Sequence, residues 1–136
     1  MSADIKIRKG FNLNLNGEAN KILSESERSK TYALKPTDFF CLKPKILVKQ
    51  GDKVKKGTPL FFSKNNPRIH FVSPVSGEIL AISRGEKRKI LEVVISSSSD
   101  DNDSVEFETA NFKNFSVEEI IDILLKSGSW PFILQR

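Results

Sequence analysis

Short apolar runs separated by glycine turns fill the middle of the chain, from residue 41 to residue 95. None is long enough for an ordinary helix, and several alternate apolar with polar residues, which is the period of a strand. Gly51 and Gly57 stand where tight turns need a residue that tolerates a positive φ. The predicted strands are residues 46–48, 58–62, 68–72, 78–83 and 90–95. This pattern indicates a small β-barrel or sandwich, with its core over residues 44–95.

Strands are also predicted before this core, and one helix after it. Residues 32–34 form one short run, and apolar residues alternate with polar ones at Ile5, Ile7, Phe11, Leu13 and Leu15. A helix is predicted over residues 116–127, because Ser116 and Glu119 have the spacing of a capping box and an apolar stripe follows. Gly128 then suits a left-handed C-terminal cap. The predicted fold class is mostly β (α+β), with additional N-terminal strands and a C-terminal helix.

The chain is expected to form a single domain over residues 1–136, because this length is too short for two ordinary domains. No stretch approaches the roughly 20 apolar residues of a membrane-spanning helix. The start lacks the apolar centre of a signal peptide. Cys41 is the single cysteine, which excludes an internal disulfide and fits a reducing compartment. We therefore expect a soluble segment in the cytoplasm.

The C-terminal end combines a polar loop with an apolar tail. Residues 96–104 contain a serine run followed by aspartates, which predicts a solvated acidic loop. Residues 128–136 crowd large apolar side chains where a natural terminus is usually polar and frayed, at Trp130, Phe132, Ile133 and Leu134. We expect the N-terminal fragment of a longer subunit, with this tail starting a link to a missing domain. The alternative is a tail that folds back on the core of its own domain.

Charge is distributed unevenly along the chain. Residues 43–89 contain twelve basic and three acidic residues, whereas residues 90–136 contain three basic and nine acidic ones. Seven basic side chains in or beside turns are predicted to form a partner surface: Lys49, Lys53, Lys55, Lys56, Arg84, Lys87 and Arg88. The alternative is a solvated basic face that pairs with the acidic C-terminal third. Nucleic acid is not expected as a partner, because few aromatic residues interleave with the basic ones and no binding motif occurs.

Residues suited to catalysis are scarce. His70 is the single histidine and lies in a strand pattern without an orienting partner, so a surface or packed role is expected. The chain has too few cysteines and histidines for a structural zinc site or an iron–sulfur cluster. No glycine-rich fingerprint joins a strand to a helix, so no dinucleotide site is expected. We expect no catalytic residue, no metal and no cofactor in this chain, and therefore no flavin absorbance and no NADH oxidation.

Two turn motifs resemble the biotinyl/lipoyl-carrier domain. Residues 48–60 read VKQGDKVKKGTPL, and residues 71–79 read FVSPVSGEI. That family folds as two interlocked sets of short strands, so the resemblance implies a barrel-sandwich hybrid like a lipoyl domain. The carrier lysine of the family stands at the hairpin tip between the two motifs. Here that place is Asn66, with Lys64 as the nearest lysine, so neither covalent lipoyl nor covalent biotin is expected.

The order of several motifs resembles the A-subunit family of the sodium-translocating NADH:quinone reductase. They are IKIRKGFNL at residues 5–13, the motif of residues 51–60, PVSG at 74–77, SRGEKR at 83–88 and SGSW at 127–130. The resemblance implies a non-redox, peripheral segment on the cytoplasmic side of the inner membrane, with other subunits of a membrane respiratory complex as partners. The C-subunit family of the Rnf electron-transfer complex shares the barrel but adds cysteine clusters, so this chain fits it less well. The remaining alternatives are a lipoyl-like interaction module and an independent oxidoreductase.

Quinone is the substrate of such a complex, and the resemblance links the A-subunit family to quinone binding. A quinone site needs an apolar slot with donors for the carbonyl oxygens. Aromatic residues flank the predicted hairpin tip at 64–67, and the candidate donors there are Asn65, Asn66, Arg68 and His70. Strand alternation should send half of the aromatic residues into the core. We therefore expect a scaffold that binds quinone weakly or not at all by itself, beside a site completed elsewhere.

Overall fold

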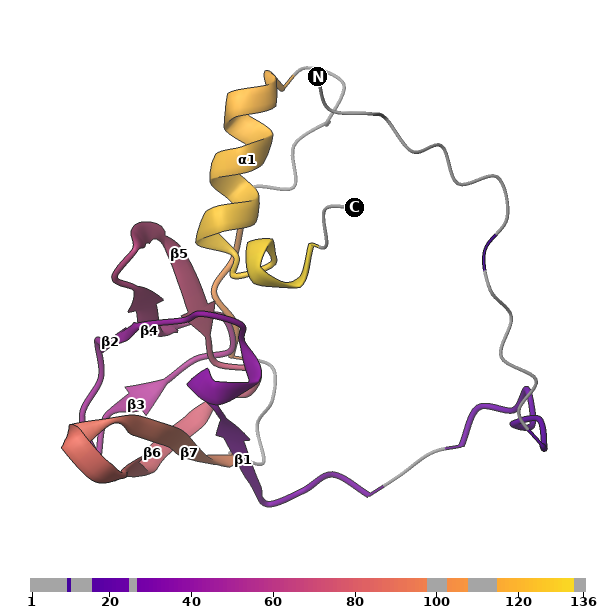
Figure 1. Cartoon of the computed structure of the whole chain (residues 1–136), viewed down its shortest axis with the longest axis horizontal. Coiled ribbons are helices and arrows are strands. Elements are labelled where there is room, and N and C mark those ends of the chain that lie inside the picture. The colour runs from indigo at the N-terminus through magenta and orange to yellow at the C-terminus, as the bar shows by residue number, and fades with distance from the viewer. Residues whose placement is uncertain (1–9, 11–15, 25–26, 98–102, 108–114, 134–136) are drawn as a thin grey trace, which may run out of the picture.

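In the computed structural model, the described residues form two antiparallel β-sheets with one α-helix beside them (Figure 1). The structure describes residues 10, 16–24, 27–97, 103–107 and 115–133. The first sheet has the strand order β1–β7–β6–β3, and the second has the order β2–β4–β5. The mostly β fold is therefore confirmed. The strands are β1 (Thr31–Leu34), β2 (Pro44–Ile46), β3 (Lys53–Val54), β4 (Pro59–Ser63), β5 (Asn66–Val72), β6 (Gly77–Arg84) and β7 (Ile90–Ser97).

Glycine turns connect the two carrier-like motifs, residues 48–60 and residues 71–79, to each other. Gly51 and Gly57 have φ angles of +88° and +90°, a region that side chains other than glycine rarely adopt. The Gly51 N–H donates to the carbonyl of Ile79, and the Gly57 N–H donates to the carbonyl of Ser73, both at 2.8 Å. Both turns of the first motif are therefore hydrogen bonded to the second motif, which interlocks the two halves of the core.

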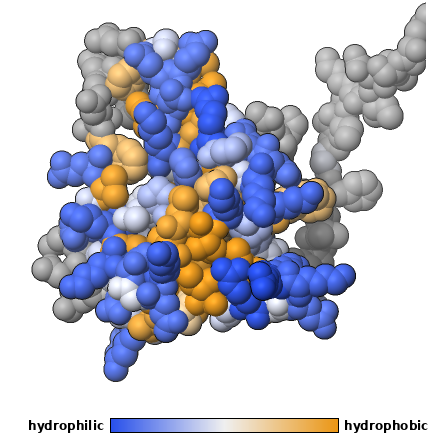
Figure 2. Space-filling model, turned by 90° about the vertical axis from the view of Figure 1, so that its left-hand side faces the viewer, coloured by the Kyte–Doolittle hydropathy of each residue, from blue (hydrophilic) through white to orange (hydrophobic). Residues whose placement is uncertain are grey.

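Apolar side chains from both sheets fill the space between them. The Phe61 ring stacks on the Phe71 ring, with centroids 5.0 Å apart. The pairing of β4 with β5 changes register between Pro59 and Phe61, and such a bulge lets two successive residues of one strand turn inward. The side chains with no exposed surface include Leu60, Phe61, Ile79, Val93 and Ile95. Outside this core, one face of the molecule keeps an apolar area exposed among hydrophilic groups (Figure 2).

Several boundaries differ from the predicted ones for reasons of strand pairing. β7 extends to Ser97 because β6 and β1 pair with its end, so Ser96 and Ser97 do not belong to the acidic loop. β5 begins at Asn66, and Pro67 is tolerated within it because β5 is an edge strand of the second sheet. β2 ends at Ile46, earlier than expected. The strand predicted at residues 5–15 lies, apart from Gly10, outside the described residues.

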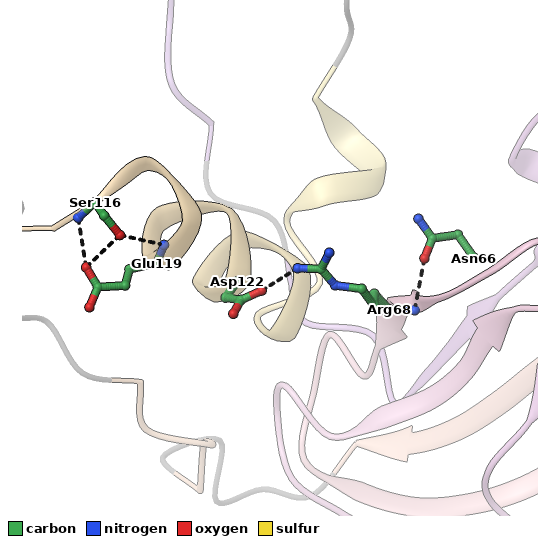
Figure 3. Close-up of polar contacts among 5 residues, drawn as sticks. All are labelled: Asn66, Arg68, Ser116, Glu119 and Asp122. Atoms are coloured by element: carbon green, nitrogen blue, oxygen red, sulfur yellow. Dashed lines mark hydrogen bonds and ion pairs between the residues drawn. The ribbon is translucent and has the colours of Figure 1, made fainter.

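The helix α1 (Val117–Lys126) has both of its predicted ends. At the start, the Glu119 N–H donates to the Ser116 hydroxyl at 3.3 Å, and the Ser116 N–H donates to the Glu119 carboxylate at 2.7 Å (Figure 3). At the other end, the Ser129 N–H donates to the Leu124 carbonyl at 3.1 Å, and Gly128 has a φ of +73°. This is the Schellman arrangement, in which a left-handed glycine closes the helix.

α1 is attached to β5 by an apolar contact and by an ion pair. Leu125 is 5% exposed, and the backbone of Gly128 lies against the side chain of Val72. The Arg68 guanidinium of β5 contacts the Asp122 carboxylate of α1 at 2.5 Å (Figure 3). Both partners of this pair are exposed, so its contribution to stability is small, roughly 0.2–1 kcal/mol. Close backbone packing at Gly128 therefore positions the helix more than charge does.

The apolar tail contacts its own domain. Trp130–Phe132 forms a short 3-10 turn, η4, directly after the helix. The Phe132 ring meets the Phe39 ring edge-on, with centroids 5.8 Å apart. Residues 130–132 thus contact their own domain, and the expected link to a further domain stays a prediction. Leu134 lies outside the described residues.

Replacing Gly128 with alanine is expected to destabilise the domain by about 2–4 kcal/mol. An added Cβ would stand 2.6 Å from Val72 Cγ2 and 2.8 Å from Val72 Cγ1, at a φ of +73°. Gly51→Ala is the matched control, because Gly51 has a φ of +88° but no neighbour within 4 Å of its Cβ position. That variant should lose only about 1 kcal/mol, the cost of the left-handed backbone. Urea unfolding measures both, and equal losses would refute the close contact.

Acid is expected to loosen the start of α1. Hydrogen bonds from the backbone and the hydroxyl of Ser116 lower the pKa of Glu119 from its ordinary value of 4.5. A carboxyl whose pKa is lower when folded stabilises the helix fully above the ordinary value, and this stabilisation disappears as the pH falls through the lowered one. NMR titration should give a midpoint below 4.5 for Glu119. Glu119→Gln should abolish this acid sensitivity, whereas Glu118→Gln should retain it, and a midpoint at or above 4.5 would contradict the capping geometry.

Candidate functional site

An open cavity of about 590 Å³ lies beside the hairpin of β4 and β5. This volume is within the range of small-molecule sites. Two of the predicted donors, Asn65 and Asn66, line it, together with the β5 side chains of Ile69 and Phe71. Its remaining lining comes from two other segments, residues 38–42 and Trp130–Pro131, and from Ser63 of β4. The cavity is therefore mainly apolar and aromatic, with amide groups at the hairpin end.

Three segments that are distant in sequence form this cavity. Residues 39–42 turn between the 3-10 helix η1 (Pro36–Asp38) and β2, and the left-handed backbone of Cys41, with a φ of 53°, makes that turn. The Phe39 ring packs edge-on against Phe71 at 4.6 Å between centroids. Phe40 points outward and is 98% exposed. Phe39, Phe40 and Leu42 were not among the predicted site residues, although three apolar residues before a strand were a usable signal.

The other two predicted donors lie elsewhere. Arg68 and His70 alternate with Ile69 and Phe71 along β5, so strand geometry directs them to the opposite side. Arg68 is occupied by its ion pair with Asp122. His70 is paired across the sheet with Phe62, and their rings meet edge-on with centroids 6.4 Å apart. The alternation expected from the sequence is thus observed, and it separates Arg68 and His70 from the cavity.

Asn66 joins the cavity to the edge of β5. Its side-chain oxygen accepts a hydrogen bond from the Arg68 N–H at 3.2 Å (Figure 3). The amide nitrogen of the same side chain is a hydrogen-bond donor. Trp130 adds an indole N–H to the lining. Amide and indole donors beside aromatic side chains can bind a flat apolar molecule that carries carbonyl oxygens.

The tip of the hairpin differs from the position deduced by counting residues. Ser63 is paired with Asn66, so the turn consists of Lys64 and Asn65. The resemblance to the carrier domain had placed Asn66 at the tip. The turn comes earlier because the pairing is irregular between Phe62 and Ser63, where β5 contains three more residues than β4. Lys64 therefore occupies the turn, and its N–H donates to the carbonyl of Lys43 at 2.8 Å.

The seven basic residues predicted as one partner surface fall into two groups. Lys53 of β3 is paired with Glu78 at the start of β6, whereas Arg84 ends that strand. At about 3.3 Å per residue, these two ends of β6 are roughly 20 Å apart. The first group is Lys49, Lys53, Lys55 and Lys56, and the second is Arg84, Lys87 and Arg88. The sequence could not show this division, because it depends on how β3 is paired.

Basic residues of the middle of the chain (43–89) form ion pairs with acidic residues of its C-terminal third (90–136). Lys55 Nζ lies 2.8 Å from the Asp103 carboxylate, and Arg68 pairs with Asp122. The hydrogen bond and the charge of Asp103 raise the pKa of Lys55 above its ordinary value. Two basic residues therefore follow the alternative interpretation, in which the basic face pairs with the acidic C-terminal third.

Within the part of the chain that the structure describes, no three side chains of the metal-binding types His, Cys, Asp and Glu come together. Among the same residues, no helix combines the length and the apolar character needed to cross a bilayer.

Comparison with known proteins assigns the fold and the family. Residues 5–98 match the model of the NqrA N-terminal barrel-sandwich hybrid domain. The A-subunit of the Na(+)-translocating NADH-quinone reductase from Neisseria meningitidis serogroup A is 40% identical over 135 residues, which are 97% of this chain. The proteins of the same name from Marinomonas sp. and Yersinia pseudotuberculosis are 34% and 37% identical over 96% and 97% of it.

The chain spans 30% of the length of each of these relatives. The matched range includes the described strands β1 to β7, which run from Thr31 to Ser97. The expected barrel-sandwich hybrid is therefore confirmed, as is the resemblance inferred from the motif order. This chain belongs to the family of the NqrA N-terminal barrel-sandwich hybrid domain.

Proposed function

We propose that this chain is a non-redox scaffold segment of a Na⁺-translocating NADH:quinone reductase. It acts on the cytoplasmic side of the membrane, where it contacts other subunits of the complex. Its cavity beside the β4–β5 hairpin forms one wall of a quinone site that other parts of the complex complete. The observation that carries this proposal is the open, mainly aromatic cavity with the amides of Asn65 and Asn66 at one end.

The lining of the cavity suits a quinone ring better than a charged substrate. Phe39 and Phe71 provide aromatic surface, and Ile69 adds an aliphatic side chain. Aromatic rings favour stacked or edge-on contacts with another ring, which contribute about 0.5–1.5 kcal/mol beyond the burial of apolar area. Amide donors match the carbonyl oxygens of a quinone without introducing charge. The names of the relatives include a quinone substrate, which agrees with this chemistry.

The openness of the cavity supports a shared site. Phe40 is almost fully exposed at its margin, and Phe132 of η4 is 68% exposed. A site that binds tightly by itself usually buries most of its ligand. A wall formed by residues 39–42 and η4 therefore needs a facing surface, which the rest of the complex supplies in this proposal.

The isolated chain should bind a soluble short-tail quinone only weakly. A titration followed by Trp130 fluorescence and amide NMR shifts tests this, because Trp130 lines the cavity. We expect small, non-saturating changes at Asn65, Ile69 and Trp130. Saturable micromolar binding centred on residues 65–71 would show a site that is complete within the chain. Shifts confined to Phe132 and Ile133, both exposed, would mean adhesion to an apolar surface.

Steady-state kinetics of the assembled complex test whether the cavity beside the β4–β5 hairpin contributes to quinone binding. Asn65→Ala combined with Asn66→Ala should raise the KM for quinone about three- to tenfold and leave kcat nearly unchanged, because the amides contribute to binding rather than to electron transfer. Asn20→Ala is the control, since Asn20 is exposed and does not line the cavity. An unchanged KM in the double variant would remove the hairpin from the quinone site.

Charge reversal tests the role as a scaffold. Lys49 and Lys53 lie in and next to the turn before β3 and are exposed, whereas Lys55 is already paired with Asp103. Lys49→Glu with Lys53→Glu should reduce co-purification with the other subunits severalfold, because charges across an interface guide association. The control is Lys30→Glu with Lys126→Glu, which changes the net charge equally at other exposed positions. Equal recovery of both variants would show that the β3 end is not a partner surface.

A further inference from the structure

A second cavity, of about 600 Å³, lies where three segments converge. Residues 36–37 and 39–44 form one side, Lys64 at the tip of the β4–β5 hairpin forms another, and residues 88–90 at the β6–β7 turn form the third. Apolar side chains form part of this cavity, among them Phe39, Leu42 and Ile90. Residues 39–42 thus separate this cavity from the one proposed for quinone, and they line both.

Four cations line this second cavity. They are Lys43, Lys64, Arg88 and Lys89, and no carboxylate of the described residues lines it with them. Among the described residues, none of these four takes part in an ion pair. Like charges gathered at one concave surface repel each other and create a positive potential that attracts an anion. The positive potential of the four cations therefore favours the binding of an anionic group in this cavity.

The backbone holds these cations in place by contacts that are independent of the side chains. The Lys64 N–H donates to the carbonyl of Lys43 at 2.8 Å, which joins the hairpin tip to the segment before β2. In the β6–β7 turn, Lys87 and Arg88 have φ angles of 52° and 59°. The left-handed region is uncommon for residues other than glycine, and such strain persists only where the surrounding structure holds it.

Neighbouring hydrogen bonds maintain the strained turn. The Gly85 N–H donates to the carbonyl of Lys89 at 2.8 Å, and the Lys89 N–H donates to the carbonyl of Glu86 at 3.0 Å. The Arg84 guanidinium reaches the carbonyl of Arg88 at 3.5 Å. Arg84 thus supports the turn, whereas Arg88 lines the cavity. Strained backbone of this kind clusters at ligand sites, and here it belongs to a residue that lines the cavity, Arg88.

We propose that this cavity binds the phosphate of an anionic amphiphile. The guanidinium of Arg88 forms a fork that matches two phosphate oxygens, and the lysines Lys43, Lys64 and Lys89 add point charges around it. The apolar side chains of Phe39, Leu42 and Ile90 receive the start of an acyl chain. Two sources carry this chemistry, namely an acidic phospholipid in a bilayer and a single amphiphile in solution.

The test uses the full chain and three probes. They are short-chain phosphatidylglycerol in monomeric form, vesicles with and without phosphatidylglycerol in phosphatidylcholine, and inorganic phosphate. Calorimetry and amide NMR shifts follow the soluble probes, and co-sedimentation follows the vesicles. The variant is Lys64→Gln with Arg88→Gln, and the control is Lys30→Gln with Lys126→Gln, which removes the same charge at exposed positions outside the cavity. Circular dichroism confirms that both variants are folded.

We expect saturable binding of the monomeric amphiphile, with shifts at residues 42–44, 64 and 88–90. The variant should weaken this binding about tenfold or more, because charge-assisted hydrogen bonds to phosphate are lost, and the control should remain within about twofold. Co-sedimentation that requires phosphatidylglycerol and is lost in the variant identifies a bilayer lipid, whereas binding of the monomer alone identifies a soluble amphiphile. Equal losses in variant and control would show unspecific attraction and overturn the proposal. Inorganic phosphate that binds as tightly as the amphiphile would overturn the apolar part of the site.

Discussion

The rest of this structure depends on the packing of the Phe71 ring against two other aromatic rings. Phe71 stacks on Phe61 inside the core at 5.0 Å between centroids and meets Phe39 edge-on at 4.6 Å. Phe39 in turn contacts Phe132 of η4. A row of four rings thus runs from the centre of the domain to its surface. Because protein interiors are closely packed, a change in one ring is transmitted to its neighbours, so core packing and the shape of the proposed quinone wall are not independent.

Charge has a different role from packing in this domain. The ion pairs Lys55–Asp103 and Arg68–Asp122 join the basic middle of the chain to its acidic third. Exposed pairs of this kind contribute roughly 0–1 kcal/mol each, which is little beside the buried apolar core. They add to the backbone contacts that already position residue 103 and α1. The cations around Arg88 have no such partner among the described residues and remain available to bind an anionic ligand.

The candidate site was only half predictable from the sequence. Asn65 and Asn66 follow an aromatic strand at a turn signal, so their place near an apolar slot could be inferred from local spacing alone. Arg68 and His70 were grouped with them by proximity in sequence, but along β5 they alternate with Ile69 and Phe71, which line the cavity. Phe39 lies 26 residues before Asn65 in the sequence, and Trp130 lies 65 residues after it. Only packing brings such distant segments together.

Local rules explain what the sequence by itself determined. The glycines of the turns, the capping box at Ser116 and the left-handed end at Gly128 each depend on a few neighbouring residues, because backbone dihedrals and cap hydrogen bonds are local quantities. The tertiary structure alone decided which strands pair, how far β7 extends, and which basic residues meet carboxylates. Those outcomes depend on the balance of burial and pairing among segments distant in the chain, and a linear pattern does not contain the distances that set it.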